Sequence, residues 1–297
     1  MTGVAAGNAF ERYMVESATA VDAALERWVP AEDQAGPLAA AMRHIVFSGG
    51  KRLRPALVLL GCEHVGGLRQ DALGAAAAVE LVHAYSLLHD DLPCMDDGTL
   101  RRGKPCAHIV YGEAMAVLAG DALLTLAFEV LARHTPPERP VGAMIGALAT
   151  AAGWGGMVGG QVADLQGEGQ EPELERVHAI HAGKTAAMIS VSLRLGAMAG
   201  GGRPPTVELL ADVGRDLGLA FQIVDDLLDV EGTTAELGKQ AGADAQRSKM
   251  TWPAAAGVSA SWRDARELVD GALQRSARAG GPELLAALGA FILPRRS

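Results

Sequence analysis

The chain has 297 residues, 49% hydrophobic and 21% charged, which is enough apolar material for a large core. Lys and Arg number 26 against 35 Asp and Glu, so the net charge is −9; this argues against non-specific nucleic-acid binding, which needs clustered positive charge. Three cysteines without a Cys-x-x-Cys pair argue against a disulfide framework or a zinc site and favour free thiols in a reducing cytoplasm.

Helical segments alternate with glycine- and proline-rich loops along the chain. Ala, Leu, Glu and Arg dominate, and strand-like alternation is not evident, which predicts an all-α fold. Residues 8–28 mix acidic and basic residues with apolar ones at helical spacing, unlike a signal peptide. Further segments of helical length follow at 72–91, 112–133, 174–199 and 206–230.

One segment, 141–163, carries no charged residue and is long enough to span a bilayer. It is rich in Gly and Ala, and its glycines cluster at positions 153, 155, 156, 159 and 160. Weak hydrophobicity and this cluster favour a buried core helix followed by a turn. We therefore expect no membrane span.

Two acidic clusters lie in apolar surroundings. The first comprises Asp90, Asp91 and Asp96, and the second comprises Asp225, Asp226 and Asp229. Carboxylates packed on apolar helices repel each other and resist burial, so a cation should hold them. Mg²⁺ suits such oxygen ligands because it commonly bridges carboxylates and substrate phosphates. The alternative, a solvated acidic helix end, suits one cluster better than two.

Basic runs complete the pattern. A glycine turn is followed by Lys51, Arg52 and Arg54, and the first acidic cluster is followed by Arg101, Arg102 and Lys104. Arg binds phosphate oxygens bidentately and Lys supplies a point charge, so the runs suggest two diphosphates, one held through metal and one held directly. His83 lies about two helical turns before Asp90 on the same face. It is a candidate phosphate donor, unless it is a satisfied core or surface residue.

The motifs are very specific in combination. They are Gly-Lys-Arg-Leu-Arg-Pro at 50–55, Asp-Asp-x4-Asp at 90–96, Arg-Arg-Gly at 101–103, Lys-Thr at 184–185 and Phe-Gln-x-x-Asp-Asp-x-x-Asp at 221–229, with Lys239 and Lys249 downstream. Over about residues 47–253 the chain resembles the bacterial trans-polyprenyl synthases, the farnesyl and geranylgeranyl diphosphate synthase family. The insertion Pro93-Cys94 is similar to that of the bacterial and plant subtype. Departures at Gly98, Thr99 and Cys106 remove no expected ligand.

The resemblance implies an isoprenoid-synthase helical bundle around a deep central cavity, usually as a homodimer. Length alone suggests about two domains, but the two acidic clusters must face each other in one cavity. We therefore expect one domain over residues 1–297. The implied activity is head-to-tail condensation of isopentenyl diphosphate with an allylic diphosphate, dimethylallyl or geranyl, assisted by three Mg²⁺.

The resemblance also implies a role for each matching residue. Isopentenyl diphosphate would be bound by Lys51, Arg54, His83 and Arg102. Mg²⁺ would be bound by Asp90, Asp91 and Asp96 from one wall and by Asp225, Asp226 and Asp229 from the other. The allylic diphosphate would be bound by Arg101, Lys184 and Lys239, with Thr185 and Gln222 near the allylic carbon. The catalytic candidates are Lys184, Thr185, Gln222 and Arg101.

Product length is expected to follow from the cavity floor. In the resembling family the fourth and fifth residues before the first acidic motif form this floor, and here they are Ser86 and Tyr85. An aromatic residue there stops chain growth early, so Tyr85 predicts a C15 product, farnesyl diphosphate. Ser86 is small and Val82 is modest in size, which leaves a C20 product, geranylgeranyl diphosphate, open.

Two other interpretations remain to be separated. A terpene cyclase on the same fold would not need Lys51, Arg54 and Arg102, because it has no second diphosphate to bind. A non-catalytic partner subunit of a synthase should have lost one acidic motif, and this chain keeps both.

Overall fold

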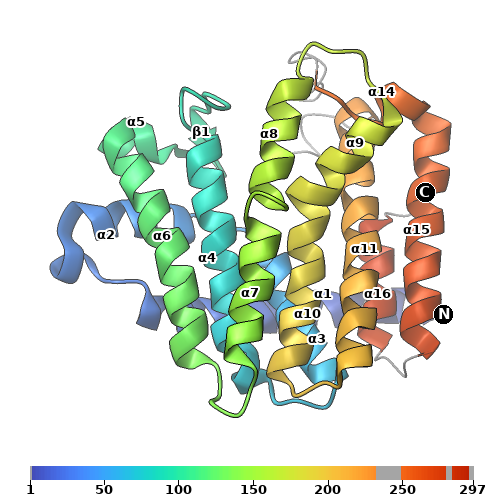
Figure 1. The fold of residues 1–297 in the computed structure, drawn as a ribbon, viewed down its shortest axis with the longest axis horizontal. Helices are drawn as coiled ribbons and strands as arrows, with labels where there is room; N and C mark the ends of the chain where they lie inside the picture. Colours follow the sequence, from blue (N-terminus) through green and yellow to red (C-terminus); the bar gives the residue numbers. More distant parts are fainter. Residues whose placement is uncertain (1, 232–248, 279–282, 294–297) are drawn as a thin grey trace.

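The apolar segments of the sequence form long helices, most of which stand side by side (Figure 1). The computed structural model describes residues 2–231, 249–278 and 283–293. The α-helices are α1 (Thr2–Trp28), α2 (Glu32–Val46), α3 (Leu53–His64), α4 (Leu73–Asp90), α5 (Ala107–Tyr111), α6 (Glu113–His134), α7 (Val141–Ala152), α8 (Met157–Gly167), α9 (Leu174–His181), α10 (Ala187–Ala199), α11 (Pro204–Glu231), α14 (Trp252–Ala256), α15 (Val258–Arg278) and α16 (Glu283–Ile292). The all-α prediction is confirmed.

Three short elements were not foreseen. A 3₁₀ turn, η1 (Arg69–Ala72), leads into α4, and a π-helical turn, η2 (Ala182–Ala186), joins α9 to α10. A small antiparallel hairpin pairs β1 (Leu100–Arg101) with β2 (Lys104–Pro105). The segment predicted as one helix over 174–199 is therefore helical throughout but is widened by a π turn in its middle.

The core runs through the centre of the bundle. Helix α4 packs against α6 and α3, α3 packs against α10, and α11 packs between α10 and α15. Glycine permits the closest of these approaches, because a Cβ at Gly196 of α10 would lie 1.9 Å from the Val58 carbonyl oxygen of α3. Small residues also allow the Ala-rich first half of α4 to be buried on all sides. This buried helix ends at the first acidic cluster, so a rigid element positions those carboxylates.

By length and composition alone, three helical stretches of the described residues could cross a membrane. They are Arg69–Asp90, Glu113–His134 and Val141–Gly167. The most apolar window of the first is 72% buried inside the bundle, whereas the other two are 39% and 28% buried. The expectation of a buried core helix over 141–163 is therefore wrong. This segment forms α7, which packs against α6 and α10, then a glycine turn and α8, which packs against α9 and η2; much of its surface stays exposed.

Candidate active site

The two acidic clusters lie on different helices and border the same group of lysines. The first cluster begins at the C-terminal end of α4, and the second lies near the C-terminal end of α11. The Nζ of Lys249 lies 3.8 Å from Asp96 Oδ1 of the first cluster. Lys249 also lines a pocket of about 220 Å³ together with Asp225 and Asp226 of the second cluster. Cationic side chains thus stand between the two groups of carboxylates.

Asp164 on α8 is a third source of negative charge at this pocket. Its Oδ2 accepts a hydrogen bond of 2.6 Å from Lys184 Nζ and lies 3.8 Å from Lys249 Nζ. Burial lowers the pKa of Lys184, but Asp164, Asp90 and Asp96 outweigh that effect and raise the pKa. Lys184 is therefore a charged ammonium paired with Asp164.

The π turn η2 presents both Lys184 and Thr185 at the pocket. Such turns are rare and are frequent at functional sites, because the extra residue changes the direction in which side chains project. Helix α8 passes very close to this turn, since a Cβ at Gly160 would lie 2.2 Å from the backbone nitrogen of Lys184. The glycine cluster noted in the sequence therefore allows α8 to approach the catalytic candidates.

A chain of hydrogen bonds connects Thr185 to the second acidic cluster. The Thr185 hydroxyl donates to Gln222 Oε1 (2.8 Å), and Gln222 Nε2 donates to Asp226 Oδ1 (3.1 Å). The other oxygen of Asp226 accepts from the Trp252 backbone N–H (2.9 Å) and lies 3.2 Å from His181 Nε2. Both oxygens of the buried Asp226 are thus already engaged by protein groups.

In the first cluster, too, the second aspartate is bonded to a protein group. Arg101 Nε donates to both oxygens of the buried Asp91, at 3.0 and 3.2 Å. A predicted metal ligand and a predicted diphosphate binder are therefore each other's partners. Asp90 lies nearer the lysines: burial, with help from Asp96, raises its pKa to about 6, and Lys184 opposes that rise.

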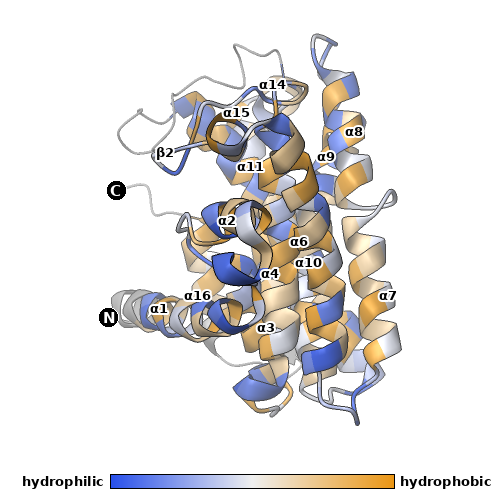
Figure 2. Ribbon diagram, turned by 90° about the vertical axis from the view of Figure 1, so that its left-hand side faces the viewer, coloured by the Kyte–Doolittle hydropathy of each residue, from blue (hydrophilic) through white to orange (hydrophobic). Residues whose placement is uncertain are grey.

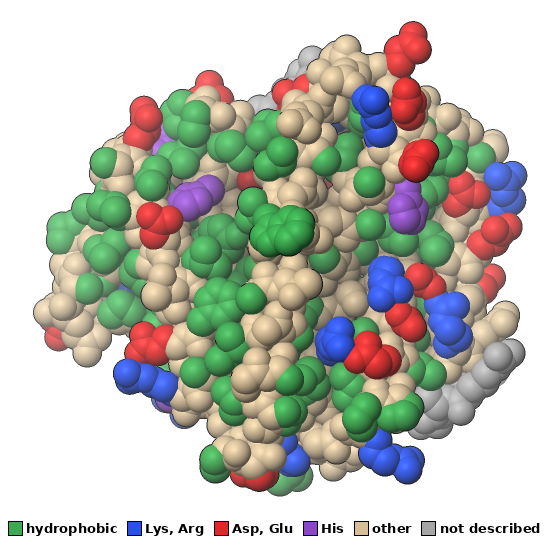
Figure 3. All heavy atoms as spheres, viewed as in Figure 1, with side chains coloured by type: hydrophobic (Ala, Val, Ile, Leu, Met, Phe, Trp, Pro, Cys, Tyr) green, Lys and Arg blue, Asp and Glu red, His purple; other side chains and the backbone are tan. Residues whose placement is uncertain are grey.

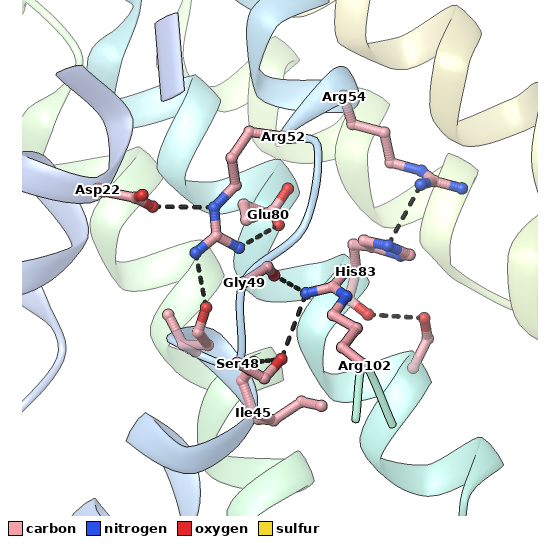
Figure 4. A network of polar contacts seen from close by, with 11 residues as sticks. Asp22, Ile45, Ser48, Gly49, Arg52, Arg54, Glu80, His83 and Arg102 are labelled. Carbon is pink, nitrogen blue, oxygen red and sulfur yellow. Dashed lines mark hydrogen bonds and ion pairs between the residues drawn. The ribbon is translucent and has the colours of Figure 1, made fainter. Parts of the chain in front are cut away.

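Three of the residues expected to bind isopentenyl diphosphate come together elsewhere along α4 (Figure 4). Arg54 Nη1 lies 3.3 Å from His83 Nε2, and Arg102 donates to the Gly49 carbonyl and to Ser48 Oγ (3.3 Å). The buried Nε of Arg54 has no hydrogen-bond partner within the described part of the chain. A phosphate oxygen could accept from it.

Charge accumulates at this second position. Burial and the surrounding arginines, first Arg54 and then Arg102, hold the pKa of His83 well below its usual value. Burial also lowers the pKa of Arg54, and Arg102 adds to that effect. A neutral imidazole beside unneutralised guanidinium groups favours an anionic ligand.

The remaining predicted residues are placed less centrally. Lys51 is exposed, and its Nζ lies 5.5 Å from the ring centroid of Phe291 on α16. Tyr85 is buried with its ring edge-on to His89 at 5.8 Å, and Ser86 Oγ donates to the His83 carbonyl (2.9 Å). Lys239 lies outside the described residues.

Several residues of the site had not been singled out from the sequence. Asp164 is an isolated acid in a glycine-rich helix, and His181 and Trp252 lie just outside the Lys184-Thr185 motif and Lys249. Lys249 belonged to the recognised motif set but had no assigned role. The packing of α9 and α14 against α11, and of α8 against η2, brings these residues into the site.

Comparisons with known proteins identify the family. The polyprenyl synthetase profile matches residues 36–282. The chain is 48% identical over 268 residues to the chloroplastic geranylgeranyl pyrophosphate synthase 12 of Arabidopsis thaliana, covering 87% of this chain and 73% of that protein. It is 47% identical over 257 residues to farnesyl diphosphate synthase of Escherichia coli strain K12, covering 84% and 86%. The crystal structure of a Helicobacter pylori geranyltransferase complexed with magnesium and isoprenyl diphosphate matches with a TM-score of 0.83 at 31% identity, covering 95% and 96%.

The chain therefore belongs to the polyprenyl synthetase family and has the isoprenoid-synthase fold. Within that family it is a short-chain trans-prenyl diphosphate synthase, a prenyltransferase of isoprenoid biosynthesis. The resemblance inferred from the motifs is confirmed.

The raised pKa of Asp90 predicts that this residue destabilises the ligand-free enzyme at neutral pH. A carboxyl whose pKa is about 6 in the folded state and about 3.8 in the unfolded state makes folding less favourable at high pH, and this cost disappears as the pH falls. Asp90→Asn should therefore raise the melting temperature at about pH 7.5, with the gain shrinking toward about pH 4. Thermal unfolding in metal-free buffer measures this.

Asp212→Asn on α11 is the matched control, since its side chain is 53% exposed. It should leave the melting temperature nearly unchanged at every pH. A gain for Asp90→Asn that does not depend on pH would contradict the electrostatic explanation.

Proposed function

We propose that this enzyme uses Mg²⁺ to condense isopentenyl diphosphate with dimethylallyl or geranyl diphosphate, head to tail, and that farnesyl diphosphate is its product. The observation that carries this proposal is the presence of two separate groups of charged side chains along one helix. At the end of α4, carboxylates and lysines border one pocket; closer to its middle, Arg54, His83 and Arg102 form another cationic group. A condensing enzyme needs both, because it binds two diphosphates.

The donor set fits magnesium completed by a substrate. Among the described residues, no three His, Cys, Asp or Glu side chains converge closely enough to hold an ion unaided. Mg²⁺ keeps several waters and commonly uses one or two carboxylates together with phosphate oxygens. We propose Asp90 and Asp96 on one side and Asp225 and Asp229 on the other as its ligands. Asp91 and Asp226 would have to exchange their present partners to bind it directly.

The residues around the pocket have distinct roles in this proposal. Mg²⁺, when bound, neutralises the leaving diphosphate as its charge grows, and we propose three ions per site. Lys184 and Arg101, with Lys239 outside the described residues, would add positive charge to the same leaving group. The carbon–oxygen bond of the allylic diphosphate breaks with its electron pair on oxygen. Thr185 and Gln222 offer oxygen dipoles to the resulting cation and are held in place by their mutual hydrogen bond.

The second substrate supplies the new bond. Arg54, His83 and Arg102, joined by Lys51 once its flexible side chain turns toward the site, would bind isopentenyl diphosphate. The alkene electron pair of this substrate forms the new carbon–carbon bond, and a proton then leaves, we propose to the released diphosphate. No protein base is needed. The cation requires a dry cavity, and the buried apolar walls of α4 supply one side of it.

The two alternative functions are weighed on the same observations. A cyclase would leave the Arg54–His83–Arg102 group without a ligand. A non-catalytic subunit would not need both acidic clusters together with Lys184 and Lys249. We also infer a single domain and a cytoplasmic location, supported by continuous helix packing from α6 to α15 and by three free thiols, Cys62, Cys94 and Cys106.

The proposed reaction predicts a specific loss of activity. Purified enzyme with Mg²⁺, isopentenyl diphosphate and an allylic diphosphate should release a prenyl diphosphate. Asp225→Ala should lower kcat by about 10²-fold or more, because the leaving group loses charge stabilisation. Asp212→Ala, on the same helix but exposed, should keep normal turnover. Near-normal turnover of Asp225→Ala would reject the metal assignment, and an inactive wild type would favour the partner-subunit interpretation.

Product length is predicted from Tyr85. The buried ring packs edge-on against His89, and burial together with Asp90 raises the pKa of its phenol. Relatives named for C15 and for C20 products are about equally similar to this chain. We expect the wild type to make mainly C15, and Tyr85→Ala to shift the product to C20 because the floor is lowered.

Chromatography of the dephosphorylated products measures this shift. Tyr111→Ala, which removes a half-buried tyrosine on α5, should leave the C15 product unchanged. Mainly C20 product from the wild type, or an unchanged product from Tyr85→Ala, would show that the floor lies elsewhere.

We propose a homodimer, with no membrane span, from the apolar surface over α5 to α8. Hydrophobic side chains gather on the left and centre of the face in Figure 3, where these helices lie in Figure 1, and α7 is coloured as mainly hydrophobic in Figure 2. The large exposed apolar residues there are Ile109, Val110, Val117, Leu118, Trp154, Val158, Val162 and Leu165. A patch of this kind on a folded chain marks an interaction surface.

Light scattering at micromolar concentration should give twice the chain mass. Leu118→Glu with Val162→Glu should give the single-chain mass, because two charges would be buried at the interface. Leu68→Glu, which alters an exposed leucine outside this surface, should remain dimeric. A monomeric wild type, or co-sedimentation of the wild type with lipid vesicles, would contradict the proposal.

A further inference from the structure

Arg52 lies between two candidate diphosphate ligands in the sequence but turns away from them in the structure. Its Nη1 donates to Glu80 Oε1 at 2.6 Å, its Nε donates to Asp22 Oδ1 at 2.8 Å, and its Nη2 donates to the Val46 carbonyl at 2.7 Å (Figure 4). The Arg52 and Glu80 side chains are only 3% and 4% exposed. A planar guanidinium with all three nitrogens engaged is fixed in position as well as neutralised.

The backbone that carries Arg52 needs this fixation. Arg52 has a φ of 49°, in the left-handed region that a residue with a Cβ rarely adopts. It follows Gly49 and Gly50, whose φ values are 96° and 126°. A Cβ at Gly50 would lie 2.6 Å from the guanidinium of Arg102. An unfavourable backbone conformation persists only where its surroundings determine it, and here the ion pairs of Arg52 do so.

The same contacts connect the loop to the helix that bears the other ligand. Glu80 and His83 are three residues apart on α4, so they project from neighbouring positions on one side of it. Asp22 adds α1 to the connection. The contacts of Arg52 thus fix the position of the chain segment that leads to Arg54 relative to the turn of α4 that carries His83.

Glu80 also balances the charge of the cationic group. It is the leading group that opposes the lowering of the pKa of both Arg54 and Arg102 by burial. Without buried carboxylates, the neighbouring guanidinium groups of Arg52, Arg54, Arg101 and Arg102 would repel one another. Asp22 pairs with Arg52 and Asp91 pairs with Arg101, so the positive charge available to an anionic substrate is that of Arg54 and Arg102.

We propose that the buried Arg52–Glu80 pair is the positioning element of the isopentenyl diphosphate site, which sets where Arg54, His83 and Arg102 stand without touching the substrate. The proposal rests on the proposed function, because it assumes that these three residues bind that substrate. It assigns a role to Arg52, which lies in the 50–55 motif, that differs from the role of its neighbours Lys51 and Arg54.

A purely structural ion pair makes a different prediction. Replacing both members of a buried pair by apolar residues of similar volume often keeps or improves stability, whereas removing one member leaves a buried charge and is strongly destabilising. The double variant Arg52→Met/Glu80→Met therefore keeps a filled core but loses the hydrogen bonds by which the Arg52 guanidinium fixes the loop and α4. If the pair served only stability, this variant would bind both substrates normally.

The test is steady-state kinetics of the double variant with each substrate varied in turn. We expect the KM for isopentenyl diphosphate to rise about tenfold or more, because small displacements of binding groups are costly. The KM for the allylic diphosphate should change by less than about twofold, since Lys184 and the acidic clusters are not connected to the pair. Titration calorimetry with isopentenyl diphosphate alone should show the same loss of affinity.

The matched control is Arg69→Met/Glu63→Met, which removes an ion pair of 2.8 Å at the opposite end of α3. It should leave both KM values unchanged. Arg52→Lys keeps the positive charge but not the planar guanidinium with its several donors. It should raise the KM for isopentenyl diphosphate by a smaller factor than the double variant.

Unchanged KM for isopentenyl diphosphate in a folded double variant would overturn the proposal, and so would equal increases in both KM values. If the double variant fails to fold, Arg52→Lys decides in the same way, because an unchanged KM in that variant also overturns the proposal. A wild type that forms no prenyl diphosphate, or that binds no isopentenyl diphosphate, would instead reject the proposed function.

Discussion

The constraint that organises this protein is the need to keep opposite charges paired inside an apolar bundle until substrates arrive. Two acidic clusters, Asp164 and two lysines meet where α4, α8 and α11 converge, and water cannot fully solvate any of them. The structure answers with direct pairs: Lys184 with Asp164, and Arg101 with Asp91. Each pair lowers the cost of burial and presets the position of a group that a diphosphate would recruit.

Within each acidic cluster the second aspartate is engaged by protein groups. Asp91 holds Arg101, and Asp226 accepts from Gln222 and from the backbone of Trp252. These contacts fix the clusters rigidly against the bundle. The unfavourable ionisation of Asp90, visible in its raised pKa, is the expected consequence of burying a carboxylate beside Asp96.

Helix α4 carries one residue of each of the groups described above. It carries Glu80, His83, Tyr85 and Asp90 in that order, so the proposed positioning pair, the proposed isopentenyl diphosphate site, the proposed floor and the proposed metal-binding end are spaced along one helix. Because the first half of α4 is buried on all sides, its position is set by its packing against α3 and α6. Differences in product length within such an architecture can therefore arise from one side chain without changing either diphosphate site.

Much of this could be predicted from the sequence because it depends on local order along the chain. The four long helices, the acidic clusters, the lysine of the π turn and the basic motifs are all contiguous signals, and helical spacing alone places Asp225 and Asp229 on one face.

What the sequence could not determine is which side chains meet across helices. Asp164, His181 and Trp252 carry no local signature, and Arg52 looks like one more phosphate ligand until the fold turns it toward Glu80. The exposure of α7 and α8 was likewise decided by tertiary packing. An apolar, glycine-rich segment has the same sequence pattern whether it is buried in the core of its own chain or lies on the surface. Local pattern determines which chemistry the chain carries, whereas long-range packing in a low dielectric decides which charges are neighbours.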